Sequence, residues 1–274
     1  TGLWKFHYDK NMTQASVAID GFASCDYDCK CWDDIYVPAH IQMEGYDVPL
    51  YANVQYPWDG KENIWSAGNE EDALSAVPTQ FNPTATYVKY FTLPENMKNK
   101  RIFVSFQGVE SGFALWLNGE YVGYSEDSFD PSDFELTGFI KEGENKLAVQ
   151  VYKWTASSFC EDQDFFRFTG LARDTYVFSR EKDRLEDIRV VANGAGEATI
   201  RAEVSKNITS VEFQILDPLG KEVALTKVKP EKKIADALLQ VPSVRQWSAE
   251  TPWLYTLNVT AYNKKGISET TSIE

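Results

Sequence analysis

Apolar and polar residues alternate along short stretches of this chain, which is the pattern of half-buried β-strands. The clearest stretches are residues 86–93, 101–106, 146–154, 197–205, 210–216 and 254–262. Asn118-Gly119, inside FALWLNGEYVGYS, gives the strongest hairpin signal between them, because both residues of such a turn adopt positive φ. Amphipathic helical periodicity is almost absent. The pattern therefore predicts an all-β protein.

The chain changes character after about residue 180. The first part is rich in Trp, Phe and Tyr and carries long polar insertions, whereas the part after SREKDRLEDIRV is plainer and richer in Val, Thr and Lys. The remaining stretch of about 90 residues, with regular strand spacing, suits an immunoglobulin-like β-sandwich. We expect two domains, residues 1–181 and residues 182–274.

The net charge is −14 and the isoelectric point is near 4.7. Nucleic acid and anionic membrane are disfavoured as partners, because binding them requires a basic face. No run reaches the roughly 18 apolar residues of a membrane helix, and TGLWKFHYDK lacks the layout of a signal peptide. We expect a cytoplasmic protein, with a secreted form left open.

Three of the four cysteines, Cys25, Cys29 and Cys31, lie close together, and Cys160 stands apart. The three could be soft-metal ligands, but a tetrahedral zinc site needs a fourth ligand, and the only histidines are His7 and His40. We favour free thiols, which indicates a reducing compartment.

The stretch FCEDQDFFRFTG crowds Glu161, Asp162 and Asp164 beside two phenylalanines and Arg167. A carboxylate beside aromatic rings is a usual way to hold a sugar, whose hydroxyls donate to the oxygens while its C–H face lies on a ring. The alternative is a solvated loop with a structural Asp–Arg pair. The local chemistry leaves both readings open.

Residues 37–58 lack periodicity yet are rich in aromatic residues, so we expect an ordered loop, and ordered long loops are often functional. Within it, we expect His40 to be a packed imidazole bonded to a backbone carbonyl rather than a functional group. Asn53 could fix a turn or bind a ligand.

The stretch ENIWSAGNEEDA is similar to the segment that carries the acid/base glutamate of retaining glycosidases built on β/α barrels, which raises Glu70 as a candidate. Such glutamates follow apolar parallel strands, and a barrel needs roughly 200–250 residues of βα alternation. Glu70 lies in a polar loop, and no such alternation exists in the chain. We do not expect Glu70 to be catalytic.

Several long blocks resemble the β-galactosidases of glycoside hydrolase family 2. They are WDDIYVPAHIQMEGYDVPLYANVQYPW, FQGVESGFALWLNGEYVGYSEDSFDPSDFELTGFIKEGENKLAVQVYKW, EDQDFFRFTGLARDTYVFSR and QWSAETPWLYTLNVTA. The resemblance implies a jelly-roll sugar-binding domain, then an immunoglobulin-like sandwich, then a catalytic β/α barrel that this chain lacks. The catalytic glutamates and the magnesium site of such enzymes lie in the barrel, so we expect no catalytic residue here.

The resemblance assigns a role to two residues. Asn53 in YANVQYP and Asp164 in EDQDFF match motifs that enter the galactose pocket, and Asp164 is expected to share a sodium ion with barrel groups. Glu161 and Asp162 then support Asp164. The chain departs from the family pattern at Cys160, at Phe165-Phe166 and in the insertion at 59–75, so packing around the pocket is expected to differ.

These observations predict the non-catalytic N-terminal part of a retaining β-galactosidase, inactive alone. Its expected partners are a β-galactoside and its own barrel, in a homo-oligomer as the full enzyme, with no nucleic acid and no membrane. Three alternatives are a free-standing carbohydrate-binding module, a purely structural pair of sandwiches, and a family 2 hydrolase for glucuronides or mannosides. The EDQDFF block argues against the last.

Overall fold

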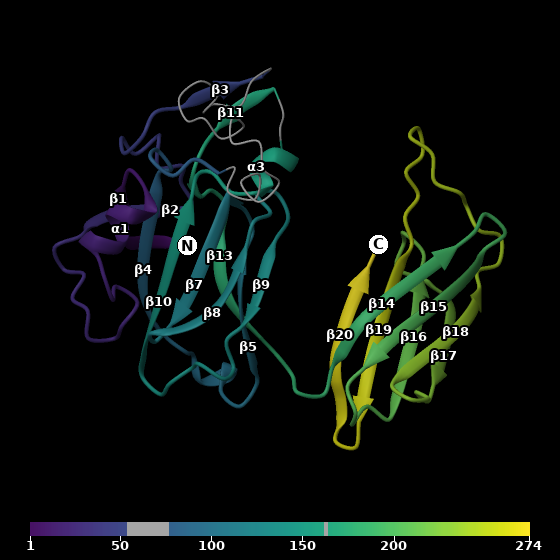
Figure 1. Cartoon of the computed structure of the whole chain (residues 1–274). Coiled ribbons are helices and arrows are strands. Elements are labelled where there is room, and N and C mark those ends of the chain that lie inside the picture. Colours follow the sequence, from purple (N-terminus) through teal and green to yellow (C-terminus); the bar gives the residue numbers. More distant parts are fainter. Residues whose placement is uncertain (54–76, 162–163) are drawn as a thin grey trace, which may run out of the picture. The chain divides into compact units, whose positions relative to one another are not determined.

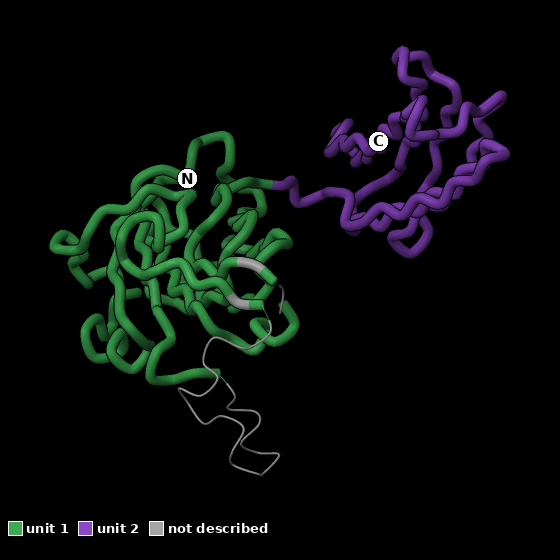
Figure 2. Tube along the Cα trace, turned by 90° about the horizontal axis from the view of Figure 1, so that it is seen from above, with its two compact units in different colours: residues 1–179 green, residues 180–274 purple. Residues whose placement is uncertain are grey.

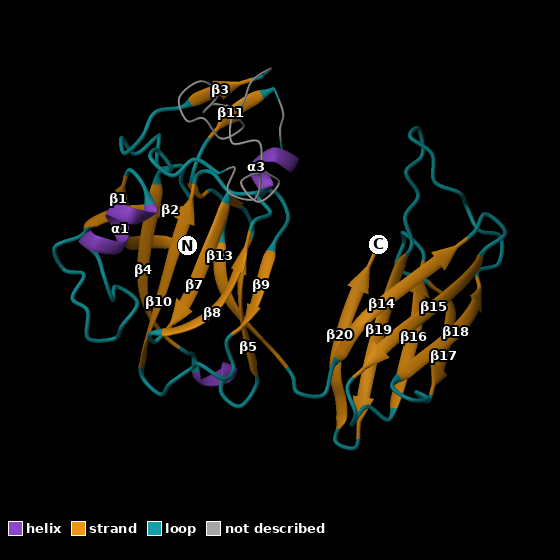
Figure 3. Ribbon diagram, in the orientation of Figure 1, coloured by secondary structure: helices purple, strands orange, loops and turns teal. Residues whose placement is uncertain are grey.

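The computed structural model describes residues 1–53, 77–161 and 164–274. These residues form two compact units, Thr1–Ser179 (unit 1) and Arg180–Glu274 (unit 2), coloured separately in Figure 2. Strands dominate both units, and the described helices are short (Figure 3). The all-β class predicted from the sequence, a jelly roll followed by an immunoglobulin-like sandwich, is confirmed.

Unit 1 is a sandwich of antiparallel strands (Figure 1). Its larger sheet has the order β2-β1-β4-β10-β7-β8, and its smaller sheets are β13-β5-β9, β12-β6 and β11-β3. The elements are β1 (Gly2–Asp9), α1 (Met12–Ala18), β2 (Asp33–Val37), β3 (Leu50–Ala52), β4 (Thr84–Thr92), η1 (Glu95–Met97), β5 (Arg101–Phe106), β6 (Val109–Glu110), β7 (Gly112–Leu117), β8 (Glu120–Ser125), β9 (Ser132–Glu135), β10 (Glu144–Tyr152), α3 (Ser157–Cys160), β11 (Phe165–Arg167), β12 (Gly170–Leu171) and β13 (Thr175–Arg180).

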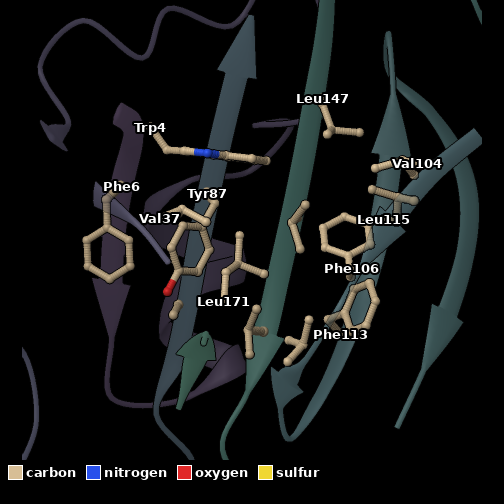
Figure 4. Packing of buried hydrophobic residues seen from close by; sticks show 14 of the residues in the cluster. Trp4, Phe6, Val37, Tyr87, Val104, Phe106, Phe113, Leu115, Leu147 and Leu171 are labelled. Carbon is tan, nitrogen blue, oxygen red and sulfur yellow. The ribbon is translucent and has the colours of Figure 1, made fainter. Parts of the chain in front are cut away.

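The core of unit 1 lies on the inner face of the larger sheet, and Figure 4 shows part of it. Aromatic rings pack in pairs there: the ring centroids of Phe6 and Tyr87 lie 5.0 Å apart, and those of Phe106 and Phe113 lie 4.8 Å apart. Each of these side chains is at most 1% exposed. Burying one such ring stabilises the fold by about 1.5–3 kcal/mol, so this core fixes the scaffold that carries the site.

The Asn118-Gly119 hairpin forms where the sequence predicts it, between β7 and β8. Both residues have positive φ, 54° and 90°. The Asn118 side chain also donates to the Phe139 carbonyl and to Asn145 Oδ1, both at 2.9 Å, so the turn is tied to the loop before β10.

The outer face of the larger sheet is partly covered by the loop that carries three of the cysteines. Cys29 is buried there against Val88 and Ala148. The Lys146 ammonium donates to the carbonyls of Ser24 and Tyr27 at 2.7 and 3.1 Å, which fixes the loop on the sheet.

Unit 2 consists of two sheets, β14-β15-β18 and β17-β16-β19-β20. Buried and exposed positions alternate strictly along β15, as the sequence pattern at 197–205 predicts. Phe213 and Val259, both fully buried, lie in the core between the sheets. The strands are β14 (Leu185–Ala192), β15 (Glu197–Val204), β16 (Ser210–Leu216), β17 (Glu222–Val228), β18 (Ile234–Gln240), β19 (Thr256–Asn263) and β20 (Gly266–Ile273).

A membrane-spanning helix is not found in the described part of the chain, where the α-helix α1 has only seven residues.

Candidate functional site

The short ladder β3–β11 brings the two predicted site residues together at one end of unit 1, close to α3 (Figure 1). The antiparallel register pairs Tyr51 with Phe166 and Ala52 with Phe165. Continued by one position, this register places Asn53 opposite Asp164. Residues opposite each other on antiparallel strands point to the same face, so we expect the two side chains on one face of the ladder.

Asp164 is exposed and is held by a phenol. Tyr51, two positions from Asn53 and therefore on the same face, donates its hydroxyl hydrogen bond to Asp164 Oδ1. This hydrogen bond to a carboxylate stabilises the neutral phenol and raises the pKa of Tyr51. No ion pair joins Asp164 to another residue among those that the structure describes. The structural Asp–Arg pair considered from the sequence therefore does not involve Asp164, and Asp162 lies outside the described residues.

Aromatic rings continue this face. The rings of Tyr51 and Phe166 meet edge to face with centroids 5.6 Å apart, and Phe166 stacks on Phe168 at 6.0 Å. Tyr51 and Phe166 are 54% and 51% exposed, which is high for large aromatic side chains. A carboxylate, an amide and exposed rings on one face are suited to a sugar, whose hydroxyls and C–H groups need both kinds of partner.

His40 extends the row of rings formed by Tyr51, Phe166 and Phe168. Its ring stacks on Phe168 with centroids 4.5 Å apart, so the predicted packing of the imidazole is observed. Within the described residues its buried Nδ1 has no hydrogen-bond partner, and the expected bond to a carbonyl is therefore not made by that nitrogen. Burial lowers the pKa of His40, because it disfavours the charged imidazolium.

Glu110 fixes the backbone just after β11. Its carboxylate accepts a hydrogen bond from the Phe168 amide at 3.1 Å. Burial, with a smaller contribution from nearby Glu161, raises the pKa of Glu110 above its ordinary value of 4.5. The acidic side chains around the site thus have different environments, since Asp164 is exposed and Glu110 is half-buried.

A buried ion pair anchors the loop that leads to Asn53. The Lys153 ammonium bonds to Asp47, and these side chains are 1% and 4% exposed. Gln42 donates to the same carboxylate at 2.8 Å and accepts from the Thr169 amide at 3.0 Å. The network ties the loop between β2 and β3 to the strands that carry the aromatic row, a role that the sequence did not indicate.

Other candidates lie outside the site. Glu70, the insertion at 59–75 and Asp162 lie outside the described residues. Cys25, Cys31 and Cys160 are exposed, Cys29 is buried, and all four are free thiols. Across residues 1–53, 77–161 and 164–274, no three His, Cys, Asp or Glu side chains are grouped so as to hold a metal ion.

Unit 2 has a cavity of about 300 Å³ of its own. It lies between the two sheets and is lined mainly by apolar side chains such as Ile215 and Leu257. Of its polar lining residues, Asn193 donates to Glu197 at 2.7 Å, and the walls are mainly apolar, so we do not regard it as the substrate site.

Two family models together match nearly the whole chain. The sugar binding domain of glycosyl hydrolases family 2 matches residues 1–180, and the model described as glycosyl hydrolases family 2 matches residues 184–273. These matches cover far more than half of the chain.

The similar curated proteins are longer enzymes. A β-galactosidase of Halalkalibacterium halodurans is 41% identical over 97% of this chain, and one of Clostridium acetobutylicum is 38% identical over 97%. The chain spans only 26% and 29% of the lengths of these two relatives.

Solved structures show the same fold at lower sequence identity. A β-glucuronidase from Ruminococcus gnavus in complex with D-glucaro-δ-lactam matches with a TM-score of 0.69 and 18% identity, over 99% of this chain and 44% of that one. At this identity the likeness concerns the fold alone. From the two family models and the curated relatives, we conclude that the chain belongs to family 2 of the glycosyl hydrolases.

Proposed function

We propose that this chain is the N-terminal, non-catalytic part of a retaining β-galactosidase and supplies one wall of the galactose pocket. The observation that supports the proposal is the hydrogen bond from Tyr51 to Asp164 on an exposed face that also carries Phe166. The β-galactosidases that share 38–41% of their residues with the chain support galactose as the sugar.

We assign Asp164 and Asn53 to binding of the sugar and not to cleavage of the glycosidic bond. An ionised carboxylate accepts hydrogen bonds from sugar hydroxyls, and an amide both donates and accepts, so the pair can orient one edge of the ring. The exposed ring of Phe166 offers an apolar surface to the C–H face of the sugar. Hydrolysis with retention needs two carboxyl groups about 5–5.5 Å apart across the scissile bond. We assign both to the catalytic barrel of the longer enzyme.

A sodium ion at Asp164 is compatible with the side chains present. Hard cations prefer oxygen ligands, and the exposed Asp164 carboxylate offers one while Tyr51 holds its orientation. One carboxylate is an incomplete ligand set, so the remaining oxygens would come from the barrel. When bound, the ion would supply positive charge beside a sugar hydroxyl. We assign magnesium to the barrel alone.

We further propose that the full enzyme is a cytoplasmic homo-oligomer acting on β-galactosides. The four free thiols favour a reducing compartment. The acidic composition, with net charge −14, gives no support for a nucleic acid or anionic membrane partner.

The proposal is tested by comparing this chain with the longer enzyme on a nitrophenyl β-D-galactoside. We expect no nitrophenol release from the chain alone and turnover once the barrel is joined to it. Turnover by the chain alone, lost on Glu70→Gln, would contradict the proposal.

The exposed aromatic face also fits a free-standing carbohydrate-binding module. Isothermal titration separates the two functions, because a module should bind an oligosaccharide with Kd at or below about 1 mM, or −4.1 kcal/mol. A single pocket wall should give no measurable heat with galactose.

A further inference from the structure

Two loops near the site exchange hydrogen bonds through two glutamates. Glu126, which follows β8, accepts through Oε2 from the Ser157 amide at 2.7 Å. In the opposite direction Glu161, which follows α3, accepts from the Ser128 amide at 2.9 Å and from the Ser128 hydroxyl at 2.7 Å. Each loop thus contributes one glutamate that accepts hydrogen bonds and one serine that donates them. These four residues are called the reciprocal clasp below.

The clasp holds both ends of α3. Ser157 is the first residue of this helix and Glu161 is its C-cap. The helix has only four residues, and its N-cap residue Ala156 makes no side-chain hydrogen bond. So short a helix is not stable by itself, and its position depends on the contacts at its ends.

The chain on either side of Asp164 is fixed to the clasp. Glu161 precedes Asp164 by three residues, and Arg167, three residues after it, donates through Nη1 to the Glu161 carbonyl at 2.7 Å. The Arg167 side chain belongs to a residue only 8% exposed, so this bond is shielded from water. Asp164 therefore lies between two residues, Glu161 and Arg167, that are joined by a hydrogen bond.

A further hydrogen bond fixes the orientation of the Glu126 carboxylate in the clasp. Tyr124 donates its hydroxyl to Glu126 Oε1 at 2.8 Å, which leaves Oε2 directed at Ser157. Hydrogen bonds to ionised carboxylates are about twice as strong as neutral ones. Ser128 and Ser157 donate three of them, so loss of a single donor should loosen the hold on Glu161 and on α3.

We propose that Glu161 and Ser128 are positioning residues for Asp164, which act by fixing Glu161 and Arg167 on either side of it and do not touch the sugar. This inference rests on the proposed function, because it assigns their effect to the sugar contact that Asp164 makes.

The first test is hydrogen exchange in the 274-residue chain. Ser128→Ala removes the hydroxyl donor, and Glu161→Gln weakens both bonds while keeping the size of the side chain. Amides of residues 157–168 should exchange about tenfold faster in both variants. Ser132→Ala is the matched control, since it removes a buried hydroxyl that pairs with Ser125 Oγ at 2.8 Å. Unchanged exchange in both clasp variants would overturn the inference.

The second test is a double-mutant cycle in the longer enzyme. Ser128→Ala should raise KM for a β-galactoside about three- to tenfold, and should add nothing in an Asp164→Ala background. Additive effects would overturn the positioning role while leaving the proposed function in place. An Asp164→Ala enzyme with unchanged KM and kcat would contradict the proposed function itself.

Discussion

Tyr51 donates a hydrogen bond to Asp164 across 113 residues of sequence. The bond lies on the exposed face of the β3–β11 ladder and holds the carboxylate next to the position of Asn53. Two segments that are distant in the chain thus contribute one carboxylate and one phenol to a single surface.

The Tyr51–Asp164 bond can be measured by ultraviolet titration of the phenol. We expect the difference between the wild-type and Tyr51→Phe titration curves to show a group whose pKa lies above the ordinary value of 10.0. Asp164→Asn should return that pKa towards 10.0, because a neutral amide does not favour the protonated phenol as a carboxylate does. A Tyr51 that titrates normally in the wild type would show that the bond is not formed in solution.

The buried Asp47–Lys153 pair gives a stability prediction. Asp47→Asn leaves the Lys153 ammonium in a site where burial already lowers its pKa, and should reduce the free energy of unfolding of unit 1 by about 3–5 kcal/mol. The loss should shrink as the pH rises and Lys153 releases its proton. Urea unfolding followed by tryptophan fluorescence measures it.

The matched control for this pair is Asp236→Asn. Asp236 pairs with Arg201 on the surface of unit 2, where these side chains are 57% and 53% exposed, so we expect no measurable change. Equal losses in the two variants would contradict the importance of the buried pair.

Glu110 predicts a pH dependence of stability. Its pKa is raised in the folded chain, so the folded state binds the proton more tightly than the unfolded state. The resulting stability is fully present below the ordinary value of 4.5 and is lost as the pH rises through the folded pKa. Glu110→Gln keeps an acceptor for the Phe168 amide and should remove this loss. Parallel stability–pH curves for wild type and variant above pH 4.5 would contradict the prediction.

Local features of the fold were predictable from sequence, and the contacts that build the site were not. Asn118-Gly119 specifies its own turn, and strict alternation marks β15, because both signals are contained within a few neighbouring residues. The ladder β3–β11 has three residues per strand and joins segments far apart in the chain, so no local pattern indicates it.

The site residues likewise include some that the sequence indicated and some that only the structure revealed. Resemblance alone points to Asn53 and Asp164, which directly flank the paired residues Ala52 and Phe165, and their role as ligands stays a prediction. Nothing in the sequence marked Tyr51 as the partner of Asp164 or Ser128 as the partner of Glu161. These pairings follow from the tertiary fold, which brings each donor within reach of a carboxylate.

The central claim is that Asp164 contacts the sugar from a wall that this chain supplies, and kcat/KM of Asp164→Asn in the longer enzyme tests it most directly. Loss of a hydrogen bond to a charged group should lower kcat/KM for a β-galactoside about 10- to 100-fold and weaken its dependence on sodium. Asp133→Asn, which neutralises an exposed carboxylate on β9, should leave both unchanged. Asp164→Asn with wild-type kcat/KM and wild-type sodium dependence would contradict the account.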